Sequence, residues 1–329
     1  MSTLEHLRSW ESFAHFNDEQ LDRLSKCVSI ARYPAESTIF EAAAQSTDAY
    51  LITEGQVRVQ RQTPYGHYTL ALLGEGRLFG EASFIDGQPR SGDAVFEAET
   101  ELLTFNHVVL TTLMERDQQI AVAFYWTLWK SLALKLRATN DQLTRFFSEQ
   151  GPRPSPEPAP RRRPKESSKN DLKAKRDLFR EQKLSNMEIN FLSSLSQQLQ
   201  VGPGEMIFRE GDPGDKLYVV LDGRVMISKD IPGAGEEALA FIERGDYFGE
   251  MALIDNQPRS ADAKVPTDGS GAVLVAIPRE VVEGLLDIQK VSSLRLLKLL
   301  CGLISKRLRE LNEKLITWFI FSGGGTDAS

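Results

Sequence analysis

The sequence has little cysteine, little histidine and no long apolar run. Its 329 residues include two cysteines and four histidines. Cys27 and Cys301 lie in different halves of the chain, so a disulfide framework is not expected and a reducing compartment is the default. No stretch approaches the roughly 20 apolar residues of a membrane span, and residues 1–13 lack the apolar core of a signal peptide. We therefore expect a cytoplasmic protein without membrane contact.

Signatures of several kinds of chemistry are also absent. The net charge of −7 argues against nucleic-acid binding by the chain as a whole. The sequence has no Walker loop, no His/Asp metal cluster and no kinase or cyclase signature. The stretch after residue 320 is too short for a helix-turn-helix. These absences predict a protein that is not an enzyme, has no cofactor or metal, and does not bind DNA directly.

What the chain does contain is an internal repeat. The stretch "FGEASFIDGQPRSGDA" at residues 79–94 returns as "FGEMALIDNQPRSADA" at residues 248–263, with 11 of 16 positions identical. The similarity extends toward the N-terminus, where Tyr50 and Tyr218 are 168 positions apart in matching contexts. Such self-similarity indicates that one structural unit of roughly 150 residues is used twice.

Each copy has the pattern of a short helix, a series of short strands and a long helix. Asn17 and Ser185 occupy helix N-cap positions, each with Gln or Glu three residues later. Runs rich in β-branched and aromatic residues, such as "LYVVLDGRVMI", then follow without intervening helices. The pattern predicts a mainly β protein with two tandem antiparallel β-rolls of the jelly-roll type, each followed by a long helix, at roughly residues 118–149 and 288–320.

The two copies also define the expected domains. Residues 1–150 form the first and residues 179–322 the second, with residues 323–329 as a flexible tail. Residues 151–178 contain six of the 15 prolines, nine Lys or Arg and four Asp or Glu. This composition predicts an extended linker, and a docking strip for an acidic partner is the alternative interpretation.

The repeated stretch combines residues that suit a phosphate and a hydroxyl. Glycine lets the backbone approach a ligand closely, and the short helical turn after Gly-Glu presents free amide N–H groups to an anion. The arginine nine positions after the glutamate can bind two oxygens of a phosphate. An ionised glutamate only accepts hydrogen bonds, so it suits a ligand hydroxyl. A phosphate beside a sugar hydroxyl describes a nucleotide.

These residues carry a family resemblance. "FGEMALIDNQPRSA" resembles the phosphate-binding cassette of the cyclic nucleotide-binding domain, the module of catabolite activator proteins and protein kinase A regulatory subunits. The resemblance covers nearly the whole chain twice, without the linker. It implies the cyclic nucleotide-binding fold, with the glutamate on the ribose hydroxyl, the arginine on the cyclic phosphate, the glycine beside the ribose and backbone amides on the phosphate. By this resemblance the ligand-binding residues are Gly80, Glu81, Ser83, Arg90 and Ser91 in the first copy, and Gly249, Glu250, Met251, Ala252, Arg259 and Ser260 in the second.

The first copy departs from the family pattern. It has "EAAAQSTDA" where the second copy has "REGDPGDKL", so the turn glycines are lost, and Ser83 replaces Ala252. We therefore expect the second site to bind more tightly. Cyclic AMP is the expected ligand, and cyclic GMP and cyclic dinucleotides stay open because the sequence does not identify the base.

The long helices carry an apolar seam. Leu297, Ile304 and Leu311 recur every seven residues, and a similar seam includes Val122 and Trp129. This spacing predicts a homodimer through the long helices, whereas packing of each helix on its own barrel, or of the two helices on each other, is the alternative.

Together these features predict a tandem cyclic nucleotide sensor. Ligand binding would change the arrangement of the long helices, and an effector protein that the sequence does not identify would respond. Three alternatives remain: a ligand-free scaffold protein of the same fold, a kinase-inhibitory regulatory subunit with the basic linker as pseudosubstrate, and a cyclic dinucleotide receptor.

Overall fold

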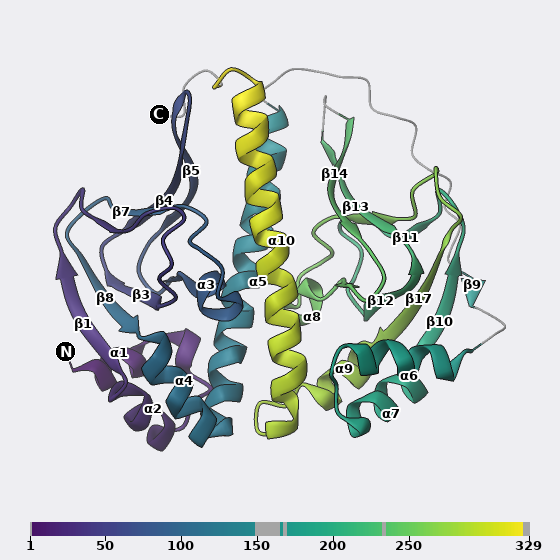
Figure 1. Ribbon diagram of the computed structural model, residues 1–329, viewed down its shortest axis with the longest axis horizontal. Helices are drawn as coiled ribbons and strands as arrows, with labels where there is room; N and C mark the ends of the chain where they lie inside the picture. Colours follow the sequence, from purple (N-terminus) through teal and green to yellow (C-terminus); the bar gives the residue numbers. More distant parts are fainter. Residues whose placement is uncertain (1, 149–164, 167–169, 232–234, 325–329) are drawn as a thin grey trace. The chain divides into compact units, whose positions relative to one another are not determined.

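The computed structural model of the chain contains two compact units (Figure 1). Unit 1 comprises Met1–Leu132 and Ile288–Ser329, and unit 2 comprises Ala133–Asp287. The structure describes residues 2–148, 165–166, 170–231 and 235–324.

Unit 1 holds the first barrel, in which eight strands form two antiparallel sheets of orders β1-β8-β3-β6 and β2-β7-β4-β5. The strands are β1 (Val28–Tyr33), β2 (Thr38–Phe40), β3 (Ala49–Glu54), β4 (Val57–Thr63), β5 (Gly66–Leu73), β6 (Leu78–Phe79), β7 (Asp93–Phe96) and β8 (Thr100–Phe105). The helices are α1 (Thr3–Ser9), the 3-10 turn η1 (Glu11–Phe13), α2 (Asp18–Ser25), α3 (Glu81–Asp86), α4 (His107–Arg116), the first part of α5 (Gln118–Ser148), the 3-10 turn η2 (Val291–Ser293) and α10 (Leu294–Phe321).

Unit 2 holds the second barrel, whose described strands form antiparallel sheets of orders β15-β12-β17-β10-β9 and β11-β16-β13-β14. The strands are β9 (Lys165–Glu166), β10 (Gln197–Val201), β11 (Met206–Phe208), β12 (Lys216–Gly223), β13 (Val225–Ile231), β14 (Gly235–Ile242), β15 (Tyr247–Phe248), β16 (Asp262–Lys264) and β17 (Ala272–Pro278). The helices are the second part of α5, α6 (Leu172–Glu181), α7 (Asn186–Leu195), α8 (Met251–Asp255) and α9 (Arg279–Leu285).

The predicted fold class is confirmed, since both units are antiparallel rolls. Apolar side chains at matching positions of the repeat fill the barrels. Tyr50 stacks on Phe79 with ring centroids 5.0 Å apart, and Tyr218 stacks on Phe248 at 5.1 Å. The capping boxes at the two N-cap positions named from the sequence are also present, because each N-cap side chain accepts from the backbone three residues later.

Both predicted long helices are present, but the second begins later in the sequence than predicted. Helix α5 has the predicted extent, whereas α10 begins at Leu294 instead of near residue 288, because α9 and the turn η2 precede it. The α10 seam is buried within the chain, and within unit 1 the Cys301 thiol donates to the Tyr125 carbonyl at 3.5 Å. This part of the α10 seam, around Cys301, is therefore explained by packing of the two long helices on each other within one chain, without a second chain.

The expected linker, residues 151–178, lies mostly outside the described residues. Its last part differs from expectation, because α6 already begins at Leu172. Asp171 caps this helix, and Leu178 and Phe179 are fully buried. Helix α6 therefore packs in unit 2 through its apolar residues, although the charge of residues 151–178 had indicated an extended linker. In the described part of the chain, no helix has both the length and the apolar composition needed to cross a membrane.

Candidate functional site

A glycine with positive φ starts each cassette, the name used below for residues 79–91 in unit 1 and 248–260 in unit 2. Gly80 has a φ of +76° and Gly249 a φ of +81°, which side chains with a Cβ rarely adopt. A Cβ at Gly80 would lie 2.6 Å from Nη1 of Arg90, and a Cβ at Gly249 would lie 2.5 Å from Nη1 of Arg259. Glycine is therefore needed both for the turn and for the arginine packed against it.

The cassette arginine is buried in both units. Arg90 is 3 % exposed and Arg259 is 4 % exposed. In each, Nη1 and Nη2 donate to two backbone carbonyls, so the main chain holds the guanidinium in place. The acceptors are Gly80 (2.9 Å) and Asp48 (2.6 Å) for Arg90, and Gly249 (2.6 Å) and Lys216 (2.8 Å) for Arg259.

An aromatic ring covers each of these guanidinium groups. Cζ of Arg90 lies 4.1 Å from the Phe40 ring centroid, and Cζ of Arg259 lies 4.3 Å from that of Phe208. Burial lowers the pKa of both arginines, and neighbouring groups offset this only in part. The rings and carbonyls in contact with each guanidinium carry no charge, and the nearby acids offset the effect of burial only in part, so each site is suited to bind an anion.

The cassette glutamate lies close to the arginine. Glu81 is 2 % exposed and Glu250 is 3 % exposed. Oε1 of Glu81 accepts a hydrogen bond from the Ser131 hydroxyl of α5 at 3.0 Å. The charge of each glutamate raises the pKa of the arginine in its own cassette. A buried guanidinium and a buried carboxylate therefore lie within one small region of each barrel.

The loop before β3 or β12 pairs with the cassette backbone. The Ala43 amide donates to the Arg90 carbonyl, and the Arg90 amide donates to the Ala44 carbonyl, both at 2.9 Å. Gly211 and Asp212 make the matching bonds in unit 2. Ala43 has a φ of +65° where Gly211 has +83°. Because a Cβ in this region costs about 1–2 kcal/mol, loss of the turn glycine leaves the loop formed but strained.

The other residues singled out from the sequence lie on the same cassettes. The Ser83 hydroxyl accepts a hydrogen bond from Arg309. The Ser91 carbonyl accepts one from Arg61. The Ser260 hydroxyl donates to the Met251 sulfur at 3.7 Å, and Ala252 is buried. The structure thus brings the predicted residues of each copy together.

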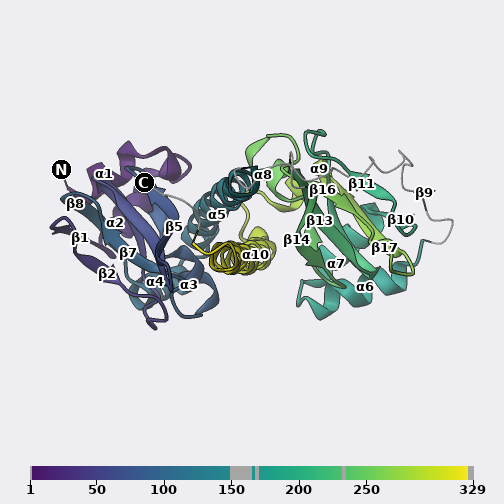
Figure 2. The same cartoon turned by 90° about the horizontal axis from the view of Figure 1, so that it is seen from above.

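Helix α10 packs against α3 in unit 1, as both views of the molecule show (Figures 1 and 2). Nε and Nη2 of Arg309 donate to the two carboxylate oxygens of Asp86 at 2.8 and 3.1 Å. Nη1 donates to the Pro89 carbonyl at 2.8 Å, and Nη2 also donates to the Ser83 hydroxyl at 3.1 Å. The Ser305 hydroxyl donates to Asp86 at 2.9 Å. The last helix of the chain therefore fixes the cassette of the first repeat.

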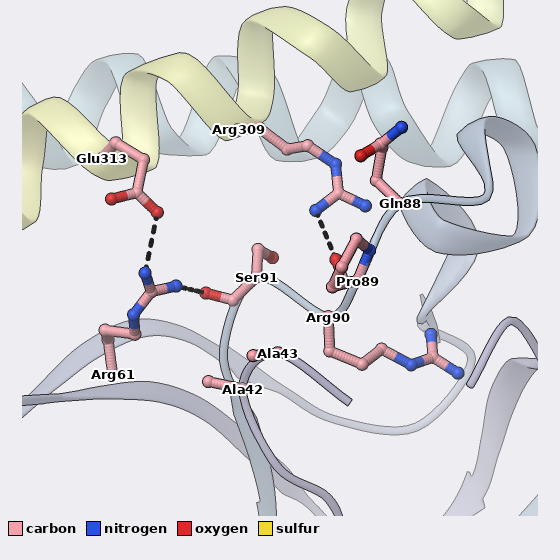
Figure 3. Close-up of a pocket in the computed structure, with 9 residues that line it drawn as sticks. All are labelled: Ala42, Ala43, Arg61, Gln88, Pro89, Arg90, Ser91, Arg309 and Glu313. Carbon is pink, nitrogen blue, oxygen red and sulfur yellow. Dashed lines mark hydrogen bonds and ion pairs between the residues drawn. The ribbon is translucent and has the colours of Figure 1, made fainter. Parts of the chain in front are cut away.

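A pocket of about 490 Å³ lies between this cassette, β4 and α10 (Figure 3). Arg61 of β4 bridges it, with Nη2 3.1 Å from the Glu313 carboxylate and Nη1 donating to the Ser91 carbonyl. Figure 3 shows Arg309 beside Pro89, whereas the Arg90 guanidinium is directed away from Arg61 and Glu313. The pocket is therefore lined by side chains of both charges.

Unit 2 repeats this arrangement with the second part of α5, which lies beside α8 (Figure 2). Nε of Arg137 donates to Asp255 at 2.9 Å, and Nη1 donates to the Pro258 carbonyl at 3.2 Å. Nζ of Lys229 on β13 lies 3.2 Å from the Asp141 carboxylate. In both units a helix arginine holds the cassette, and a strand cation pairs with an acid on the same helix.

Sequence reasoning did not find these helix contacts. The repeat does contain a signal for them. Arg61 and Lys229 are 168 positions apart, the same offset that separates Tyr50 and Tyr218, and Arg137 and Arg309 are 172 positions apart, close to that offset. Shared polar residues outside the cassettes could have indicated a shared role. Within the described ranges, no group of three or more His, Cys, Asp or Glu side chains is arranged to hold a metal ion.

Known proteins provide an independent comparison. The family model of the cyclic nucleotide-binding domain matches residues 30–117 and 198–289, more than half of the chain. The chain belongs to the cyclic nucleotide-binding domain family. It carries two such domains in tandem, as the internal repeat predicted.

Named members of the cyclic nucleotide-binding domain family differ in length from this chain. A CRP-like cAMP-activated global transcriptional regulator of Mycobacterium tuberculosis is 30 % identical over 132 residues, which is 39 % of this chain and 56 % of that protein. A cAMP-dependent protein kinase regulatory subunit of Dictyostelium discoideum is 22 % identical over 253 residues, 76 % of this chain and 63 % of that protein. The solved regulatory domain of Toxoplasma gondii PKA with cAMP is 16 % identical, with a TM-score of 0.33, 88 % of this chain covered and 92 % of that one. The chain therefore spans less than two thirds of the first two relatives.

Proposed function

We propose that the protein is a non-enzymatic sensor that binds one cyclic nucleotide in each barrel. The observation that carries the proposal is the buried arginine–glutamate pair at a positive-φ glycine turn, present in both units. Arg90 and Arg259 would bind the cyclic phosphate, and Glu81 and Glu250 would accept from the ribose hydroxyl. A bound phosphate supplies the counter-charge that each buried guanidinium needs.

Cyclic AMP is the first candidate for the ligand. The names of the relatives from M. tuberculosis and D. discoideum both refer to cAMP, which supports this choice. Cyclic GMP and cyclic dinucleotides are the other candidates, since the same arginine and glutamate would bind their phosphate and ribose.

The long helices are the elements that respond to the ligand in this proposal. Arg309 and Arg137 hold the two cassettes, so movement of a cassette around a phosphate would be transmitted directly to α10 or α5. An effector protein would detect the shifted helix. A cytoplasmic location belongs to this proposal, and the free thiols of Cys27 and Cys301 are compatible with it.

Titration calorimetry of arginine variants tests the proposal. Loss of the phosphate partner costs about 2–5 kcal/mol, so Arg259→Ala should abolish or greatly weaken binding in unit 2, and Arg90→Ala should do so in unit 1. Arg224→Ala is the matched control, because that arginine lies on the surface of unit 2, 3.7 Å from Asp268, and should bind like the parent. Equal affinity of the parent and an Arg90→Ala/Arg259→Ala double variant would reject the assigned pockets.

One observation favours a second candidate, a ligand-free scaffold, for unit 1. Nε, Nη1 and Nη2 of Arg90 each donate one hydrogen bond to a protein acceptor, so protein groups already occupy three of the five guanidinium N–H donors. In a pure scaffold neither barrel binds any cyclic mono- or dinucleotide, while both stay folded. The calorimetric panel separates the two functions.

The homodimer stays a prediction in this proposal. Burial of Leu297, Ile304 and Leu311 within one chain removes the observation from which it was inferred. Light scattering at high micromolar concentration measures the oligomeric state directly, and a monomer would leave the helix response within one chain.

A further inference from the structure

The two cassette arginines differ in the partner of a single atom. Nε of Arg90 donates to the Ser46 hydroxyl at 2.9 Å. Nε of Arg259 is fully buried, and it has no hydrogen-bond acceptor among the residues that the structure describes. Both side chains are more than nine-tenths buried. Unit 2 therefore holds an unsatisfied cationic donor in the site where unit 1 holds a satisfied one, and such a donor is costly unless a ligand completes it.

The difference follows from one position of the repeat. Ser46 and Gly214 are 168 positions apart and occupy matching places in the loop before β3 or β12. Gly214 has no side chain to offer, and a Cβ at this position would overlap the Cβ of Ala252 on α8. Unit 2 can therefore not accept a serine here without displacing its cassette, whereas Ser46 fits the loop of unit 1.

The remaining surroundings of the two arginines match. Nη1 and Nη2 donate to equivalent carbonyls, and Phe40 or Phe208 covers the guanidinium at nearly the same distance. Each arginine also has one nearby aspartate whose charge raises its pKa, Asp48 in unit 1 and Asp215 in unit 2. The Asp215 carboxylate lies 3.9 Å from Nη2 of Arg259 and is mostly exposed. The Nε partner is thus the main difference in direct contacts.

We propose that Ser46 sets the ligand affinity of unit 1 by occupying the guanidinium donor that receives a phosphate oxygen in unit 2. A charged phosphate oxygen is a stronger acceptor than a neutral hydroxyl, but in unit 1 it must first displace the serine. In unit 2 it satisfies a donor that is otherwise buried without an acceptor. The inference rests on the proposed function and extends it: one chain carries a tight site and a weak site, so it responds to ligand in two steps.

Calorimetry in an Arg259→Ala background, which leaves unit 1 as the binding site, tests the role of Ser46. Ser46→Ala should raise the affinity for cyclic AMP or cyclic GMP about ten-fold, or 1.4 kcal/mol. Ser46→Thr keeps a hydroxyl and should bind like the unaltered site. Ser37→Ala is the matched control, because this hydroxyl only donates to the Pro34 carbonyl. Circular dichroism checks folding, and Glu250→Gln silences unit 2 by a second route if Arg259→Ala does not fold.

The possible failures have different signatures. If unit 1 binds nucleotide with equal or lower affinity after Ser46→Ala, while unit 2 binds normally in the Ser46→Ala single variant, the role of Ser46 is overturned and the proposed function stands. If the unaltered chain binds neither cyclic AMP nor cyclic GMP, the proposed function fails with these ligands and the role of Ser46 fails with it. A gain confined to unit 1, absent in Ser46→Thr, supports the inference.

Discussion

Removal of the Arg309 side chain should destabilise unit 1 more than any exposed charge on α10. Arg309 makes four hydrogen bonds to the cassette, two of them to the carboxylate of Asp86. The side chains of Arg309 and Asp86 are each 19 % exposed, so water screens the pair only weakly. The fork-to-carboxylate geometry is the strong form of ion pairing.

The magnitude follows from what Arg309→Ala leaves behind. Breaking a buried pair costs about 3–5 kcal/mol when the other charge is left without compensation. Asp86 keeps the Ser305 hydroxyl at 2.9 Å and some contact with water, so we expect a loss of about 2–3 kcal/mol in the free energy of unfolding. Arg309→Lys retains the charge without the fork and should cost about half as much.

Urea unfolding followed by circular dichroism measures these changes as shifts of the transition midpoint. Lys306→Ala is the control on the same helix, because Lys306 is exposed and lies 3.9 Å from Glu310; it should cost less than about 0.5 kcal/mol. A double-mutant cycle with Asp86→Asn should give a coupling energy of about 1.5–3 kcal/mol. A cost for Arg309→Ala no larger than that for Lys306→Ala, or a coupling near zero, would refute the reasoning.

Two further predictions concern the turn and pH. Gly249→Ala should lower the free energy of unfolding by about 1–3 kcal/mol, because the residue has positive φ and the new Cβ meets Arg259. Gly302→Ala, in the open interior of α10, should instead stabilise by about 0.5–1 kcal/mol; equal effects of the two would contradict this. Burial lowers the pKa of His15, whose ring bonds the Ala123 carbonyl. As pH falls below about 6.5, His15 is therefore protonated more readily in the unfolded chain than in the folded chain. The free energy of unfolding should fall as a result. Between pH 7.5 and 5.5, the melting temperature should fall less in His15→Gln than in the parent. An equal fall in both proteins would count against the role of His15.

The fold was predictable because its signals are local or repeated. A β-roll places apolar residues at short, regular intervals, and the repeat doubled each signal, as at Tyr50 and Tyr218. Capping boxes involve residues three apart, so Asn17 and Ser185 could be identified directly. The cassette residues were found because Gly80, Glu81 and Arg90 lie within a short stretch in the same order as their counterparts.

The helix contacts were not predictable because they join distant parts of the chain. Arg309 and Asp86 are separated by 223 positions, and a helix pattern predicts an apolar face without indicating which barrel its polar residues meet. Several arginine acceptors are backbone carbonyls, such as those of Asp48 and Pro89, which no side-chain pattern reveals. The seam on α10 predicted burial correctly but could not decide between a second chain and the same chain.

The central claim is that each barrel binds a cyclic nucleotide through its cassette arginine. The most direct measurement is the stoichiometry of cyclic AMP bound to the unaltered chain, by calorimetry, with cyclic GMP and cyclic dinucleotides titrated in parallel. We expect two nucleotides per chain with unequal affinities, reduced to one by either Arg90→Ala or Arg259→Ala. A folded chain that binds none of these compounds, or that still binds two after either substitution, would contradict it.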